Sequence, residues 1–427
     1  MKSIDSLNSL AYKPFRRLFF GATISNIGTW IETVVIGIFM QEQTKDARIV
    51  ATALAAGYLP QALIGLFSGP LIDRFSRKKI VIACNSSSVV IAGLLAASVE
   101  LEFATPTLVI SLVFLAGFIH AISFPAWQTL INDVVPKEKV AGALTLMFAQ
   151  WNLGRIIGPA IAALLLAGNH YTIALSLNAF SFIVVIFMVS LLRQKDFQNT
   201  TTVNKSEETF RQTFLEGWKY ILSPKYGVRK GFIVYILILL WASPFIALIP
   251  NVADSVFNNK NLGTSLFTTS QGIGAVLISI TMTTFYAKLT ATRVQQILLF
   301  ILPFILIGFG LAPNLLLATP FALLFGIAYV GALTSTPVTA QLAANHEMKG
   351  RVAAGFSSTL GLLFTIASIL QGFLAQQFGA RVLFVSTGIG LAISSILVGA
   401  FSKSYSLPKS QEPDGEADFL EAGETVV

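Results

Sequence analysis

Two ionisable side chains lie deep inside hydrophobic stretches of the sequence. Glu32 follows Arg17 by 15 residues, and Arg155 follows Val140 by the same number. If both stretches are helices that start at one membrane surface, a rise of about 1.5 Å per residue puts both charges roughly 22 Å from it. We therefore expect the two charges at similar depth, where they can pair.

An ionisable group inside a membrane costs roughly 2.5 to 3.5 kcal/mol on insertion scales, and such groups often mark transport pathways. The sequence thus predicts that Glu32 binds and releases a proton or a substrate cation, with Arg155 as its partner. The alternative for both residues is a structural ion pair. Around Glu32, Ser25 and Thr29 lie on the same helical face, which predicts a polar stripe suited to lining a water-filled cavity.

Polar and aromatic side chains near these charges are candidates for substrate contacts. The chosen set is Asn26, Thr29, Trp30, Gln61, Gln150 and Asn152. Further polar and aromatic candidates are Gln128, Asn178, Gln271 and Trp151. The alternative is hydrogen bonding between helices for the polar side chains, and packing for the tryptophans. We expect His120 to be a packing histidine, Asp254 a solvated loop acid and Cys84 a packing cysteine.

Enzyme and metal chemistry are not indicated. The sequence has three histidines and one cysteine, and it lacks the GxxxxGK, HExxH, CxxC and GxSxG signatures. We expect no cofactor, no metal site and no ATP hydrolysis. The charge of +8 comes from basic residues in loops between hydrophobic stretches, which argues against nucleic acid as a partner.

The composition indicates that lipid is the solvent. The chain has 427 residues, of which 54% are hydrophobic and 12% charged, and its apolar stretches repeatedly reach the roughly 20 residues that a membrane helix needs. The predicted all-α fold has twelve spans, at 16–40, 49–72, 80–99, 105–126, 140–166, 171–192, 230–250, 264–287, 294–312, 315–338, 351–376 and 380–401.

The basic residues predict the orientation of these spans. Of 29 Lys and Arg, 24 lie on one side of the predicted topology, Arg155 lies inside a span, and four lie on the other side. Those four are Lys45, Arg48, Lys260 and Arg381. Because basic loops stay in the cytoplasm, we expect both termini to be cytoplasmic.

The two halves of the sequence resemble each other. A shift of 212 residues places five residues of the first half on identical residues of the second. The aligned residues are Ser123, Pro125, Leu130, Val140 and Ala141 with Ser335, Pro337, Leu342, Val352 and Ala353. This predicts two parallel six-helix repeats. The expected domains are a bundle at 1–192, a linker at 193–229 with an amphipathic piece, a bundle at 230–402, and an acidic tail at 403–427.

The loop after the second span reads GPLIDRFSRKK and resembles the signature of the major facilitator superfamily. Ser76 stands where that signature usually has a glycine. The resemblance implies a charged clasp to the other half of the molecule. Its members here are Gly69, Asp73, Arg74, Arg77 and Lys78.

The fifth span reads WNLGRIIGPAIAA, and its Gly154, Gly158 and Pro159 resemble the glycine and proline signature of antiporters in the superfamily. Small residues four apart let helices approach closely. With the preceding stretch FPAWQTLINDVVPKEKVAGAL, this span resembles the branch that contains the enterobactin exporter and the macrolide efflux proteins.

The resemblance implies a secondary-active transporter that exports a small amphiphilic drug, macrolide or siderophore by alternating access, in exchange for protons. We expect a monomer in a bacterial cytoplasmic (inner) membrane. One alternative keeps the fold but makes the chain a lysolipid flippase or a nutrient importer. Another makes it a membrane receptor or scaffold that transports nothing.

Overall fold

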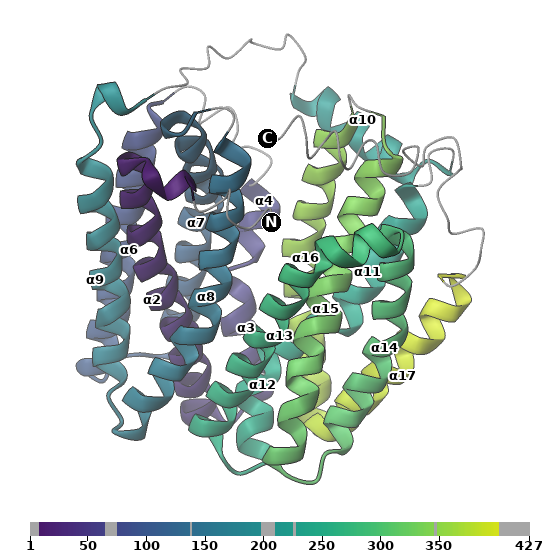
Figure 1. Cartoon of the computed structure of the whole chain (residues 1–427). Coiled ribbons are helices and arrows are strands. Elements are labelled where there is room, and N and C mark those ends of the chain that lie inside the picture. The colour runs from purple at the N-terminus through teal and green to yellow at the C-terminus, as the bar shows by residue number, and fades with distance from the viewer. Residues whose placement is uncertain are drawn as a thin grey trace.

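A computed structural model describes residues 8–64, 75–136, 139–197, 210–224, 228–345 and 348–400. Their helices form two groups that stand side by side (Figure 1). The first group is η1 (Asn8–Ala11), α2 (Lys13–Thr44), α3 (Ala47–Ala56), α4 (Leu59–Ile64), α6 (Arg77–Glu100), α7 (Pro106–Val134), α8 (Val140–Ala167) and α9 (Tyr171–Ser190). The second is α11 (Val228–Trp241), α12 (Pro244–Ser255), α13 (Lys260–Lys288), α14 (Ala291–Leu311), α15 (Leu315–Ala343), α16 (Lys349–Phe378) and α17 (Ala380–Leu397). Between the groups, η3 (Gln194–Asp196) precedes α10 (Phe210–Leu222).

Ten helical segments in the described part of the chain are long and apolar enough to cross a membrane, with α11 and α12 counted as one. α8 has 28 residues and is also long enough, although it is not among these ten. α3 and α4 occupy the position of the second predicted span. The fold therefore confirms the all-α membrane class with two six-helix repeats.

Corresponding helices of the two halves share their irregularities. α7 and α15 each have 29 residues, and the sequence repeat aligns the interior proline of α7, Pro125, with one of the two in α15, Pro337; Pro320 of α15 has no counterpart. An interior proline removes a helical hydrogen bond, so helix formation alone does not explain why both helices have a proline at the aligned position. The shared prolines are consistent with duplication of one six-helix unit.

In the described part of the chain, a two-residue interruption divides a span in each half. The second span is interrupted between α3 and α4 at Gly57 and Tyr58, and the seventh between α11 and α12 at Ala242 and Ser243. The sequence prediction of spans at 49–72 and 230–250 did not locate these interruptions. Pro60 and Pro244 each lie just after a break and cannot donate a backbone hydrogen bond to the preceding turn.

α16 contacts both breaks. The side-chain amide of Gln371 donates to the carbonyl of Leu240 at 2.6 Å. In lipid, a backbone carbonyl freed by a break needs such a partner. At the other break the Ala55 carbonyl already accepts from the Tyr58 N–H at 3.0 Å, and the Thr365 hydroxyl, which bonds to Gly361 at 2.8 Å, adds only a longer contact of 3.2 Å.

The outer surface of the bundles is apolar. Large hydrophobic side chains remain exposed on several helices, as expected where lipid replaces water. They include Phe180, Phe187, Phe300, Phe304, Leu316 and Leu397.

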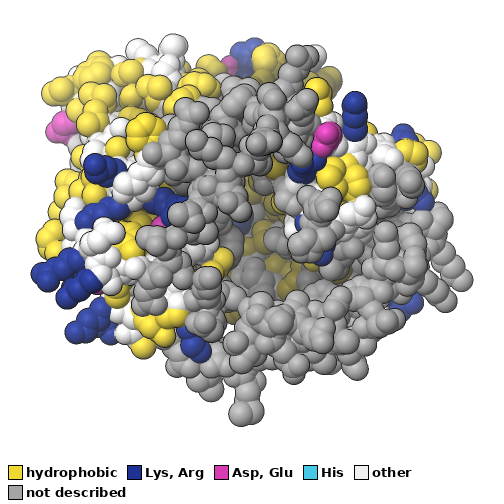
Figure 2. Space-filling view, turned by 90° about the horizontal axis from the view of Figure 1, so that it is seen from above, with side chains coloured by type: hydrophobic (Ala, Val, Ile, Leu, Met, Phe, Trp, Pro, Cys, Tyr) yellow, Lys and Arg dark blue, Asp and Glu magenta, His cyan; other side chains and the backbone are white. Residues whose placement is uncertain are grey.

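α10 lies at one end of the molecule (Figure 1). Seen from that end, the molecule is hollowed between the two halves, and hydrophobic side chains are visible in the hollow (Figure 2). α10 occupies the position of the predicted amphipathic piece, and its Glu216 pairs with Arg351 of α16. The predicted acidic tail at 403–427 lies outside the described residues.

Candidate functional site

Glu32 and Arg155 contact different partners. The side-chain amide of Asn178 on α9 donates to the Glu32 carboxylate at 2.7 Å. The guanidinium of Arg155 lies over the ring of Trp30, 5.3 Å from its centroid. The described residues show no ion pair between Glu32 and Arg155. The expected pairing is therefore corrected, because similar depth does not bring two helical faces together.

α2 presents two polar faces to two different helices. At Gly28, a Cβ would lie 2.7 Å from side-chain oxygens of Asn178 and Ser181, so the face of Gly28 and Glu32 packs on α9. Thr23 on the other face donates to Gln150 of α8 at 3.0 Å. The stripe with Glu32 therefore lies inside the first half, and not between the halves as a cavity lining would.

Gly154 and Gly158 allow α8 to approach α2 closely. A Cβ at Gly154 would lie 2.9 Å from the backbone of Asn26. A Cβ at Gly158 would lie 2.5 Å from the Cβ of Trp30. This contact places Asn26 and Trp30 of the candidate set against α8, and Pro159 is buried directly after it. The close approach also holds Arg155 at a fixed distance from the Trp30 ring.

Arg155 lies where the two halves meet. A Cβ at Gly272 of α13 would lie 2.8 Å from the Arg155 carbonyl and 3.3 Å from its Cγ. Tyr58 of the first half and Tyr329 of the second interact electrostatically with the guanidinium. The Tyr329 hydroxyl also shares a hydrogen bond of 2.8 Å with Ser243 at the break of the seventh span. These contacts join Arg155 to helices of both halves.

Aromatic rings continue from Arg155 along the first half. Trp30 and Trp151 have ring centroids 6.3 Å apart. The His120 ring lies 5.8 Å from Trp151 and 5.7 Å from Phe124. His120 lies midway along α7, and its ring packs on these two aromatic rings, as the packing prediction expects.

The other candidates have varied surroundings. Gln150 is buried and bound to Thr23, whereas Gln61, Thr29 and Asn152 are half-buried. Gln271 on α13 is wholly buried, and neither Nε2 nor Oε1 of its side chain has a hydrogen-bond partner among the described residues. Gln271 directly precedes the glycine that contacts Arg155.

Polar contacts join the halves at the end opposite α10. The Lys45 ammonium pairs with Asp254 at 2.9 Å, and Lys260 pairs with Glu42. Gln41 donates to Asp254 at 2.9 Å. These five residues are named the latch. Asp254 is therefore not the expected solvated loop acid: it lies in the last turn of α12 and accepts bonds from the first half.

All four basic residues on this side of the predicted topology have partners. Besides the two lysines of the latch, Arg48 donates to both carboxylate oxygens of Asp46, and Arg381 donates to the Ala312 carbonyl at 2.7 Å. The bond from Arg48 holds the pKa of the Asp46 carboxyl below its ordinary value. Two of these basic residues thus join the halves, whereas Arg48 makes a local pair at the start of α3 and Arg381 contacts a carbonyl of its own half.

The loop signature is described only in part. Gly69, Asp73 and Arg74 lie outside the described residues. Arg77 at the start of α6 pairs with Asp133 at the end of α7 at 3.0 Å, through both carboxylate oxygens. Lys78 donates to the carbonyl of Leu192 at 2.6 Å.

Sequence reasoning missed Asp133, Glu42, Tyr58 and Tyr329. Asp133 and Glu42 lie near the ends of apolar stretches, where solvation is the default expectation. The signal that could have found them is charge: the chain has 21 acids for 29 basic residues, so each acid near the end of a span is a candidate partner for a basic side chain. The two tyrosines carried no comparable signal.

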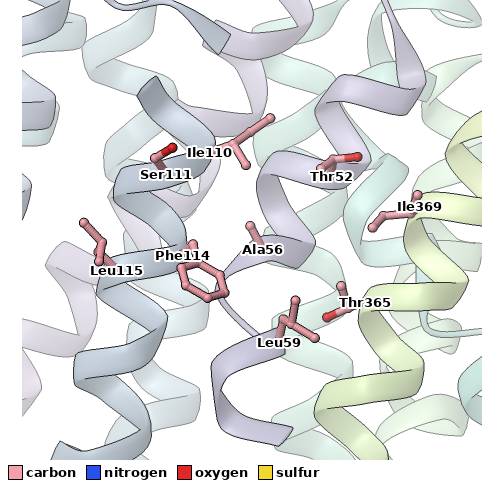
Figure 3. Close-up of a pocket in the computed structure, with 9 residues that line it drawn as sticks. All are labelled: Thr52, Ala56, Leu59, Ile110, Ser111, Phe114, Leu115, Thr365 and Ile369. Carbon is pink, nitrogen blue, oxygen red and sulfur yellow. The ribbon is translucent and has the colours of Figure 1, made fainter. Parts of the chain in front are cut away.

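An apolar crevice lies between helices of the two halves. It has a volume of about 430 Å³ and lies between α3, α4 and α7 of the first half and α16 of the second (Figure 3). Its hydroxyls already donate to backbone carbonyls, as Thr52 does to Arg48 and Ser111 to Thr107. The crevice is therefore suited to an apolar group, such as an acyl chain, and it is distinct from the polar surroundings of Arg155.

Two six-helix bundles that are latched at one end and hollowed at the other define a membrane transporter with the major facilitator fold. The chain belongs to the transmembrane secretion effector family of that superfamily, whose family model matches residues 4–419.

Curated relatives cover most of the chain at low identity. Macrolide efflux protein A of Streptococcus pyogenes is 23% identical over 386 residues, covering 88% of this chain and 92% of that protein. The staphyloferrin A transporter of Staphylococcus aureus is 20% identical over 366 residues, covering 85% and 90%.

Solved structures share the fold. The nucleoside transporter NupG has a TM-score of 0.72 at 14% identity, covering 91% of this chain and 99% of that one. A bacterial homologue of the human lysosomal transporter Spinster, solved in an inward-facing and unoccupied conformation, also has a TM-score of 0.72, at 12% identity, covering 92% and 98%. These likenesses show the arrangement of helices.

Proposed function

We propose that the protein exports small amphiphilic molecules from the cytoplasm by alternating access, in exchange for protons. The observation that carries this proposal is the difference between the two ends: the latch joins the halves at one end, and a hollow separates them at the other. A central site open to one side at a time is the requirement of alternating access.

The proposed orientation places the hollow on the cytoplasmic side. The helix ends around α10 carry most of the basic residues, and basic loops remain in the cytoplasm. The latch would then close the outer side of a bacterial cytoplasmic membrane. The family and the efflux protein named above support export as the direction. The proposal takes the chain to act as a monomer.

We propose Glu32 as the residue that takes up and releases the proton. As a carboxylate it accepts the amide hydrogen bond of Asn178 at 2.7 Å. As a neutral acid its carbonyl oxygen can still accept that bond, but the bond is no longer charge-assisted and the new O–H group needs an acceptor of its own. Protonation therefore changes the strength of the contact between α2 and α9, which links the charge at Glu32 to the packing of these helices.

The test uses purified protein in proteoliposomes and measures proton flux as dyes, macrolides, siderophores and lysolipids are added. We expect wild type to couple proton movement to at least one compound, and Glu32→Gln to lose that coupling. Asp196→Asn serves as the matched control, because this half-buried acid lies in η3, outside the bundles, where its carboxylate accepts a bond from the Arg193 N–H.

The outcomes separate the candidate functions. Coupled flux that Glu32→Gln abolishes and Asp196→Asn retains supports proton exchange through Glu32. Transport that survives Glu32→Gln with its proton coupling intact would make Glu32 a structural residue. Transport confined to lysolipids would favour the flippase, and no transport of any kind would favour the receptor.

A further inference from the structure

We propose that Arg155 is the counter-charge for an anionic group of the substrate, and that the transported molecule is a carboxylate joined to an apolar or aromatic body. The inference rests on the proposed transport function and adds the chemical class of the substrate to it.

Arg155 is a buried charge that lacks an acidic partner. The residue is 8% exposed, and its Nε has no hydrogen-bond partner. Among the described residues its guanidinium forms no ion pair, and its charge contact is the face of Trp30. A buried cation without a counter-charge is strongly unfavourable. The fold keeps this positive charge at the junction of its halves. An anion that enters the junction would supply the missing counter-charge.

The groups around Arg155 would not compete with such an anion. Tyr58 and Tyr329 are neutral hydroxyl groups, and Gln271 brings an unpartnered amide that can donate. Glu32 lies on the face of α2 that packs on α9. Each element that packs on Arg155 therefore offers neutral or donor groups, as a carboxylate site requires.

The shape of the guanidinium favours a carboxylate. Its N–H groups form a planar fork that binds both oxygens of a carboxylate at once. The rings of Trp30, Trp151, His120 and Phe124 form a series of contacts that starts at this point and continues along the first half. Flat apolar groups pack well on aromatic faces. The site thus offers an anion contact beside aromatic rings.

The position of Arg155 also suits coupling to the motion of the halves. Its stem contacts Gly272 of the second half, while Trp30 and Tyr58 belong to the first. A ligand held by the guanidinium contacts both halves, so its binding free energy differs between conformations in which the halves lie closer together or farther apart. A ligand shifts the populations of two conformations only when its affinity for them differs in this way.

The test compares three fluorescent probes that differ in head group: 1-pyrenebutyrate, its primary amide, and pyrenebutyl-trimethylammonium. Binding to the purified full chain in detergent is measured for wild type, Arg155→Gln, Arg155→Lys and the control Arg16→Gln, which removes an exposed arginine at the start of α2. We expect wild type and Arg16→Gln to bind the carboxylate at least about tenfold more tightly than the amide. Arg155→Gln should lose this preference, and Arg155→Lys should keep part of it.

A second measurement needs no variant. Phenylglyoxal modification of wild type, read by peptide mass spectrometry, should slow at Arg155 when 1-pyrenebutyrate is present and stay unchanged at Arg16. This measurement decides the matter if Arg155→Gln fails to fold. Equal or tighter binding of the amide or the cation to wild type overturns the proposal, as does absence of carboxylate binding.

Transport of the same probes separates this proposal from the proposed function. Proton-coupled movement of the neutral or cationic probe without a preference for the carboxylate would reject the anion site and leave export standing. Carboxylate binding that depends on Arg155 without transport would reject export and leave the site standing.

Discussion

At the scale of single residues, the contacts of a side chain say more about its role than its depth in the membrane does. Glu32 and Arg155 are each 15 residues into a span, yet one bonds to Asn178 and the other lies on Trp30. A spacing in sequence fixes height along a helix, but the direction of a side chain depends on how the helix is rotated against its neighbours. The two charges therefore serve separate roles in the proposed mechanism.

The contact between α2 and α8 gives a prediction at one glycine. Gly158→Ala would put a Cβ 2.5 Å from Trp30 Cβ and 2.9 Å from the Ile27 carbonyl, so the helices must separate. We expect a loss of about 1 to 3 kcal/mol in stability, typical of overpacking. Thermal unfolding in detergent checks this.

Gly93→Ala is the matched control for that substitution. Gly93 lies inside α6, and nothing lies within 4 Å of a Cβ built there. It should be neutral or stabilise the protein by about 0.5 to 1 kcal/mol, as alanine does in a helix interior. Equal effects at both glycines would contradict the role given to close packing at Gly158.

The candidate residues show which part of the site could be foreseen. Gly154, Gly158, Trp30 and Arg155 were predicted from small-residue spacing and from charge within an apolar stretch. Tyr58 and Tyr329 were not, because a tyrosine in a membrane helix is common and their meeting across the halves depends on tertiary structure. The sequence reveals a residue whose type is rare in a membrane helix, such as a charged one. It does not reveal a common residue, such as a tyrosine, whose role comes from its tertiary contacts.

At the scale of elements, the broken seventh span depends on α16. The Gln371 amide donates to carbonyls at the α11–α12 break, at 2.6 Å to Leu240 and 3.4 Å to Trp241. Gln371→Leu removes these donors and should cost about 1 to 3 kcal/mol, the price of an unsatisfied buried acceptor. Unfolding in detergent measures the loss, with the exposed Gln377→Leu of the same helix as control. A change no larger than the control's would refute this role.

The number and order of the spans were predictable because about 20 apolar residues are needed for each crossing. The breaks were not. Pro60 and Pro244 lie inside apolar stretches, and a proline in a membrane helix often produces only a kink. Whether the chain breaks there depends on donors from another helix, which are far away in sequence.

At the scale of the whole molecule, the latch holds one end closed. Replacing Glu42 by Gln and Asp254 by Asn together removes the acids that pair with Lys260 and Lys45. We expect this double variant to open at that end more often. Hydrogen exchange should then be faster in α12 and in the first turns of α13, because local opening exposes amides.

The control for the latch is Glu100→Gln, which removes an exposed acid at the end of α6 that is outside the latch. It should leave the exchange of α12 unchanged. Unaltered exchange in the latch variant would mean that apolar packing alone closes this end.

Arg155 also lies in the electric field of the membrane. It is the sixteenth residue of the 28-residue α8, which places it near mid-membrane. Carrying one charge across 100 mV is worth about 2.3 kcal/mol, and movement through part of the field is worth a share of that. An empty carrier would bring its positive charge along when the halves rock, whereas a carrier loaded with a monoanion would be neutral there. A voltage that is negative inside the cell would then act on the return of the empty carrier and favour the conformation open to the cytoplasm.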